Sequence, residues 1–285
     1  MRQDIMDMIK NMPHFSDSLF KLMKLGDGAE CSADSVIDVI KYDDRLTALV
    51  LKMVNSADFG LRVPVDSVKA AVTMLGFKRI YEVAQEVYTK MYLGKPLNGY
   101  ESASGIWQHS VRTAIASAEL AFFAKTPIDG EKAFTAGILH DIGKSVLSEF
   151  LGSTATQFVA AIDKEKYKDY LEAEDASLGT NHSEVGEALA REWHLPEYIC
   201  QSIKYHHRPS EAPEEYRAYA FTIHLGDIIA MLSCSDQGAD ALLYAVDEAY
   251  NDYLVISDVA IYSIVMEVDD QMDKLNKGFS KNDAS

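Results

Sequence analysis

Apolar residues recur every three or four positions along almost the whole chain, and this spacing limits the possible folds more than any other feature. It is the spacing of an amphipathic α-helix, whereas the alternation typical of a half-buried strand is scarce. Hydrophobic residues make up 48% of the chain, enough to give such helices a common core. The sequence therefore predicts an all-α protein, with its clearest helices at residues 67–75, 80–91, 106–124, 130–143, 182–192, 196–207, 216–231 and 258–273.

The turn-forming residues at positions 94–99, Gly-Lys-Pro-Leu-Asn-Gly, interrupt the helical pattern most strongly. We predict a domain boundary there. It separates a multi-helix N-terminal part, residues 1–97, from a larger helical bundle, residues 98–275. Residues 276–285 are predicted to form a flexible tail. The densely charged residues 164–174 are predicted to form a solvated helix or loop.

The formal net charge of −17 limits the classes of partner. A surface of this sign repels nucleic-acid phosphates and anionic lipid headgroups, so we expect neither a nucleic-acid nor a membrane partner. No segment reaches the ~20 apolar residues that a membrane-spanning helix needs. The three cysteines, Cys31, Cys200 and Cys234, are far apart and indicate neither a disulfide framework nor a thiolate metal site. A cytoplasmic location is expected.

Five histidines and two aspartates provide side chains that suit a divalent metal: His109, His140, Asp141, His182, His206, His207 and Asp227. Imidazole nitrogens with carboxylate oxygens are typical ligands of iron, manganese, zinc and nickel, and magnesium also takes carboxylates. This set is larger than one ion normally takes from a protein, so we expect one or two ions. Taken singly, a helical histidine is more often a surface residue or a satisfied core residue, and an adjacent His-Asp pair is a weak signal.

Two basic residues close to these positions are candidates for phosphate contacts. Lys144 follows Asp141 by one helical turn and can hold a phosphate as a point charge. Arg112 lies one turn after His109 on the same helix face, so it is predicted either to contact a substrate phosphate or to form a salt bridge. His224 lies one turn before Asp227 and is a candidate for orienting a metal ligand.

The segment Leu139-His140-Asp141-Ile142-Gly143-Lys144 resembles the HD superfamily of metal-dependent phosphohydrolases. The His…His-Asp…Asp pattern of that family falls here on His109, His140, Asp141 and Asp227. His182 and the His206-His207 pair resemble the further ligands of the HD-GYP branch, which hydrolyses cyclic dinucleotides. The loop after His207 reads Arg208-Pro209-Ser210-Glu211 and has no Gly-Tyr-Pro, which argues against that substrate.

The N-terminal half resembles the HDOD domain family. The matching segments are Met12-Pro13, Tyr42-Asp43-Asp44-Arg45-Leu46, Val54-Asn55-Ser56-Ala57-Asp58-Phe59-Gly60 and residues 67–76. The resemblance extends from about residue 12 to about residue 232. It implies a multi-helix N-terminal subdomain followed by an HD-type helical bundle.

The resemblance implies a bacterial signal-transduction output module with a His/Asp metal site. Its partner is then a signalling protein, or a phosphorylated small molecule or nucleotide that binds the pocket. The alternative is a metal-dependent phosphohydrolase or phosphodiesterase, in which the metal activates water or polarises a phosphoryl oxygen. A third hypothesis is oxygen chemistry at iron, which some members of the HD superfamily perform.

Overall fold

The structure is a computed structural model, and it describes residues 2–11, 32–41, 50–51, 53–55, 59, 65, 67–93, 100, 105–151, 167–192, 195–233 and 245–280. The regular elements in these ranges are helices, and Ala124 and Leu254 form an isolated antiparallel bridge. This confirms the predicted all-α class. None of the described helices combines the length and apolar character that crossing a membrane requires.

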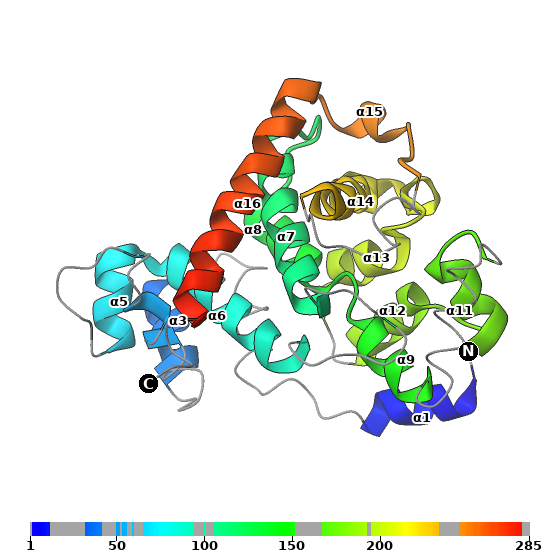
Figure 1. The fold of residues 1–285 in the computed structure, drawn as a ribbon, viewed down its shortest axis with the longest axis horizontal. Coiled ribbons are helices and arrows are strands. Elements are labelled where there is room, and N and C mark those ends of the chain that lie inside the picture. The colour runs from blue at the N-terminus through cyan, green and yellow to red at the C-terminus, as the bar shows by residue number, and fades with distance from the viewer. Residues whose placement is uncertain are drawn as a thin grey trace. The chain divides into compact units, whose positions relative to one another are not determined.

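The chain divides into two compact units. Unit 1 comprises Met1–Met12 and Leu93–Asp269, and unit 2 comprises Pro13–Tyr92 and Asp270–Ser285. The first helix, α1 (Gln3–Asn11), belongs to unit 1, where it packs against α9 and α12 (Figure 1). The last helix, α16 (Asp258–Ser280), contributes residues to both units and continues past its predicted end at residue 273. Domain limits at residues 97 and 275 stay a prediction.

In the described residues, unit 2 contains α3 (Ala33–Lys41), α5 (Val68–Leu75), nearly all of α6 (Phe77–Leu93) and the end of α16, and α3 packs against α5. Ser67 begins α5 as predicted, because its hydroxyl accepts a hydrogen bond from the Ala70 N–H. The amide of Asn55 donates to the Val65 carbonyl and accepts from the Val65 N–H, both over 2.8 Å. Most of the motif around Asn55 lies outside the described residues.

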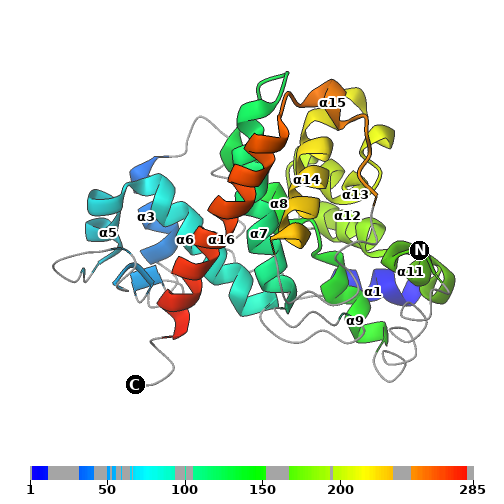
Figure 2. The same ribbon diagram turned by 45° about the horizontal axis from the view of Figure 1, so that its top comes forward.

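Unit 1 is built around α7 (Gly105–Leu120), which packs against α8 (Gly130–Leu139) and α14 (Glu214–Leu232). α13 (Glu197–Tyr205) packs against α8 and α14, and α12 (His182–Glu192) packs against α13 and α9 (Gly143–Leu151). Figure 2 shows α7, α8, α13 and α14 side by side. Further described helices of this unit are η2 (Ala121–Phe123), α11 (Tyr170–Leu178), η4 (Pro209–Glu211) and α15 (Tyr250–Tyr253).

Two predictions for unit 1 were wrong in ways that matter for the site. The predicted helix at 130–143 ends at Leu139, and residues 140–142 form a turn before α9 begins at Gly143. The charged segment 164–174 was predicted to be solvated, but its described part enters α11 and places the Glu174 side chain wholly inside the protein. Residues 164–166 lie outside the described ranges.

Candidate metal centre

All seven predicted metal ligands lie in unit 1, on helices or turns that meet near one end of α7. The structure brings them together in two overlapping groups, which are linked both through Asp141 and through the further set His140, His206 and Asp227. The first group combines His109 from α7, His140 and Asp141 from the turn after α8, and Asp227 from α14. His109 Nε2 lies 2.9 Å from Asp227 Oδ1 and 3.2 Å from His140 Nε2. His140 Nε2 lies 3.4 Å from Asp141 Oδ2.

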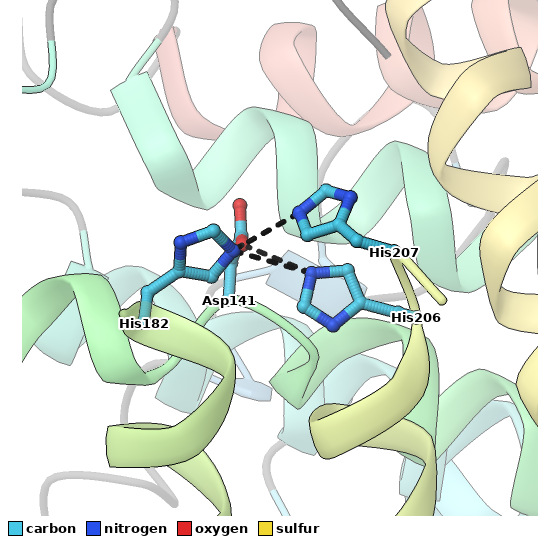
Figure 3. Close-up of side chains that lie close together, drawn as sticks. All are labelled: Asp141, His182, His206 and His207. Carbon is cyan, nitrogen blue, oxygen red and sulfur yellow. Dashed lines mark hydrogen bonds and ion pairs between the residues drawn. The ribbon is translucent and has the colours of Figure 1, made fainter. Parts of the chain in front are cut away.

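The second group combines Asp141 with three histidines from α12 and the end of α13. Figure 3 shows the rings of His182, His206 and His207 beside the Asp141 carboxylate. His182 Nε2 lies 3.3 Å from His206 Nε2, 3.0 Å from His207 Nε2 and 3.4 Å from Asp141 Oδ1. His206 Nε2 lies 3.7 Å from the same Asp141 oxygen.

Asp141 is shared by the two groups, and each of its oxygens faces one of them. Oδ2 lies on the side of His109 and His140, and Oδ1 lies on the side of His182 and His206. The residue is 1% exposed, and Oδ1 accepts no hydrogen bond from the described residues. A buried carboxylate oxygen usually has such a partner, so Oδ1 has the environment of a metal ligand.

Gly143 explains why the turn containing Asp141 comes so close to α12. A Cβ atom at Gly143 would lie 2.0 Å from the His182 carbonyl oxygen, so a larger residue cannot start α9 at this distance. The backbone of the turn therefore lies directly against the first residue of α12. This contact places Asp141 beside His182, although forty residues separate them in sequence.

Hydrogen bonds to backbone groups outside the cluster hold two of the histidine rings in place. The Nδ1 atoms of His140 and His206 donate to the carbonyl oxygens of Gly137 and Ile203, over 2.7 and 2.6 Å. A carbonyl oxygen only accepts hydrogen bonds, so in each ring the proton is on Nδ1. In the neutral ring, the Nε2 lone pair then points toward the Asp141 carboxylate. Such an outward bond is the usual arrangement of a metal-binding histidine.

Burial keeps three of these rings neutral. It lowers the pKa of His140, and it lowers the pKa of His206 and His207 well below the ordinary value, with neighbouring histidines adding to the effect. The Nε2 atom of His206, whose proton is on Nδ1, lies 3.3 Å from the Nε2 atom of His182. Several imidazole nitrogens therefore meet beside one buried carboxylate, and the residues present fit a divalent metal.

Both aspartates are ionised at neutral pH. Burial alone raises the pKa of Asp141, but the Lys144 ammonium, 2.6 Å from Oδ2, and then the histidines outweigh burial and hold that pKa well below its ordinary value. Burial also raises the pKa of Asp227, and the bond with His109 outweighs it and lowers the pKa to about 2. Two carboxylate charges are therefore available to a cation.

The two predicted phosphate-contact residues lie in different places. Lys144 lies at the cluster, paired with Asp141 and close to the Tyr100 ring. Arg112 instead donates to the backbone and side-chain oxygens of Ser233 at the end of α14 and pairs with Asp269 of α16. The salt bridge, one of its two predicted roles, is therefore present. A phosphate contact by Arg112 stays a prediction.

His224 is bonded to the backbone of His206, one of the candidate ligands. The Asp247 N–H donates to its Nε2 over 3.0 Å, so the proton is on Nδ1, which donates to the His206 carbonyl over 2.7 Å. Burial lowers the pKa of His224, in keeping with a neutral ring. The bond goes to the backbone of His206 and not to Asp227, and an orienting role of His224 stays a prediction.

Glu174 is the residue of the site that the sequence interpretation missed. Its carboxylate accepts from the backbone N–H and from Nδ1 of His182, over 2.8 and 2.7 Å. Its position in a charged segment suggested solvent exposure. The sequence places Glu174 eight residues before His182, but this spacing by itself is only a weak sign of a role in the site.

A model of the HDOD domain family matches residues 12–209 of the chain. The chain belongs to the HDOD domain family. An uncharacterized protein of Treponema pallidum (strain Nichols) is 24% identical to this HDOD chain over 220 residues, or 77% of the chain. The present chain spans only 42% of that relative's length.

Solved structures resemble this HDOD chain over nearly all of its length. An HDOD domain protein with unknown function from Geobacter sulfurreducens is 24% identical, with a TM-score of 0.76, and 96% of each chain is covered. A candidate signal transduction protein from Marinobacter aquaeolei VT8 is 20% identical, with a TM-score of 0.78. In that pair, 97% of the HDOD chain and 60% of the Marinobacter chain are covered. At these identities the likeness shows the fold alone.

Proposed function

We propose that this HDOD protein is a signalling module whose unit 1 binds two divalent cations that share Asp141. The orientation of the ligands supports this most directly. Rings held through Nδ1 turn their Nε2 atoms toward the two oxygens of one buried carboxylate. One position has as donors His109, His140 and Asp227, and the other has His182, His206 and His207.

The donor set favours a transition metal over magnesium. Five of the seven donors are imidazole nitrogens, which suit iron, manganese, zinc and nickel. Magnesium prefers a shell of oxygen ligands and retains several of its waters. We therefore expect iron, manganese, zinc or nickel in the protein isolated from cells.

Hydrolysis of a phosphoester is a second candidate function, and the position of Lys144 favours it. The Lys144 side chain is 15% exposed and lies beside Asp141 at the edge of the cluster, whereas Asp141 itself is buried. Bound divalent cations polarise a phosphoryl oxygen and lower the pKa of water. The Lys144 ammonium then attracts the substrate phosphate by charge. The substrate class is a phosphorylated small molecule or nucleotide, and a protein is the partner in the signalling role.

Elemental mass spectrometry of the purified protein tests the metal centre. We expect about two equivalents of a transition metal in the unsubstituted protein. Asp141→Asn keeps the shape of the side chain but removes the shared charge, so it should lose at least one equivalent. Asp252→Asn, at an exposed residue of α15, serves as the matched control and should retain both. An unsubstituted protein that binds no metal after loading would contradict the proposal.

Turnover of the metal-loaded protein on nucleotides, cyclic dinucleotides and aryl phosphates tests the second function. If the protein is a hydrolase, Lys144→Met should lower kcat/KM by ten-fold or more while the metal content stays unchanged, because a charge on the substrate loses its partner. Two bound metals without turnover on any of these substrates would leave the non-hydrolytic signalling module as the function.

A further inference from the structure

Glu174 connects one metal position to Tyr100, a residue that precedes α7 in the chain. The side chain is 0% exposed, yet both of its oxygens accept hydrogen bonds. Oε2 accepts from the backbone N–H and Nδ1 of His182, and Oε1 accepts from the Tyr100 hydroxyl over 2.7 Å. A buried carboxylate is costly unless it is bonded in this way, so these three bonds hold Glu174 in place.

Local structure fixes the position of Glu174 relative to His182. Asp169 caps the start of α11, and Gly179 ends it in the left-handed conformation, with φ at 71°. α12 then begins at His182, and the Asn181 amide bonds back to Asp175 over 3.0 Å. The two helices therefore meet at a short, bonded turn that keeps the carboxylate against the His182 ring.

The two metal positions have different supports. A backbone carbonyl holds His140 in one position and His206 in the other. The second position differs because a carboxylate holds another of its rings, His182. A carboxylate makes the imidazole more basic and adds negative charge close to the cation, which a neutral carbonyl does not. The position that includes His182 therefore depends on Glu174, and the position of His109, His140 and Asp227 does not.

Tyr100 contacts the same centre twice. Its hydroxyl bonds to Glu174, and its ring stacks on Tyr170 with 5.8 Å between ring centroids. The Lys144 ammonium lies 5.9 Å from the centroid of the Tyr100 ring. Tyr100 thus touches both Glu174, which orients His182, and Lys144, which pairs with Asp141.

We propose that Glu174, held by Tyr100, is a positioning residue that sets the cation affinity of the His182 position and makes the two metal positions unequal. This inference rests on the proposed two-cation centre. It assigns to Glu174 and Tyr100 a role in one metal position only.

Titration of metal-stripped protein with Co²⁺, followed by calorimetry and visible absorption, tests the inference. We expect two binding steps in the unsubstituted protein. Glu174→Ala should weaken one step by about 10- to 100-fold and leave the other unchanged. Tyr100→Phe should weaken the same step less. Glu174→Gln, which keeps an acceptor oxygen without the charge, should recover part of the lost affinity.

In each variant, the binding step that stays unchanged shows that the protein is folded. The His182→Ala variant identifies which of the two steps belongs to the His182 position. If Glu174→Ala protein binds both equivalents with unaltered affinity, this inference is overturned and the proposed two-cation function still stands. Equal weakening of both steps would also overturn it, because a general packing defect would explain that result. An unsubstituted protein without Co²⁺ binding would overturn the proposed function as well.

Discussion

Among single residues, Glu86 of α6 has an unusual environment far in sequence from the metal ligands. Its side chain is 1% exposed, and Oε1 lies 3.6 Å from the Arg79 guanidinium. Burial raises the pKa of Glu86 to about 7, because the attraction of Arg79 offsets only part of the cost of removing the carboxylate from water. The native state therefore retains the Glu86 proton at a pH where the unfolded chain has lost it.

This difference predicts how stability depends on pH. At pH values between the ordinary pKa of 4.5 and the raised pKa of about 7, the native state binds more protons than the unfolded chain. The stabilising contribution of Glu86 is therefore fully present below pH 4.5 and is lost as the pH rises through 7. Each pKa unit corresponds to about 1.4 kcal/mol. Glu86→Gln should make the melting temperature fall less between pH 5 and 8. The exposed Asp38→Asn is the control, and equal slopes in the two variants would refute the effect.

At the scale of helices, close contact between α7 and α8 brings together two candidate ligands of the first proposed metal position, His109 and His140. A Cβ atom at Gly137 of α8 would lie 2.8 Å from the Cα of Ala114 on α7. His140 follows Gly137 by three residues, and the same helix pair places His109 3.2 Å from His140. The short distance between helix axes therefore determines the distance between two ligands.

Gly137→Ala should separate α7 from α8 and destabilise the protein. The new methyl group meets backbone atoms, which cannot rotate away, so we expect a loss of about 1–3 kcal/mol and weaker metal binding. Gly130→Ala in the same helix is the matched control, because its Cβ would meet nothing nearer than 3.4 Å. Urea unfolding of both variants measures the difference. A Gly137→Ala protein as stable as the control would show that the helices have room to adjust.

For the molecule as a whole, the candidate metal ligands come from distant parts of unit 1. They come from α7, the turn after α8, α12, the end of α13 and α14, so bound cations would cross-link five parts of the chain. A cation that binds the folded state alone stabilises it in proportion to the logarithm of its concentration. The net charge of −17 adds a general attraction for cations but does not distinguish one metal from another.

Adding Mn²⁺ or Zn²⁺ to metal-stripped protein should therefore raise the melting temperature of unit 1. At a hundred times the dissociation constant the gain is about 2.7 kcal/mol, which corresponds to roughly 5–10 °C for a unit of this size. Differential scanning fluorimetry measures it, and a chelator should reverse it. Mg²⁺ at the same concentration controls for charge. The same rise with Mg²⁺, or in Asp141→Asn protein, would argue against a specific centre.

The all-α class and the resemblance to the HDOD family both follow from the order of residues in the chain. Helical periodicity is a local property, because each side-chain face repeats within four residues, and Ser67 and the span of α12 were predicted on that basis. The seven ligands were also named from the sequence, since imidazole and carboxylate groups are few and their chemistry is specific. Their assignment as ligands nevertheless depended on the family resemblance, because histidines are individually ambiguous.

The arrangement of these residues in space comes from the tertiary structure. It placed the two oxygens of Asp141 toward different histidines, buried Glu174 behind His182, and directed Arg112 to Asp269. It also ended a predicted helix at Leu139, where the apolar spacing continues into the turn. Each of these features depends on distances between helices that are far apart in sequence. Those distances are set by how side chains of different helices fill shared space, which no periodicity within one helix records.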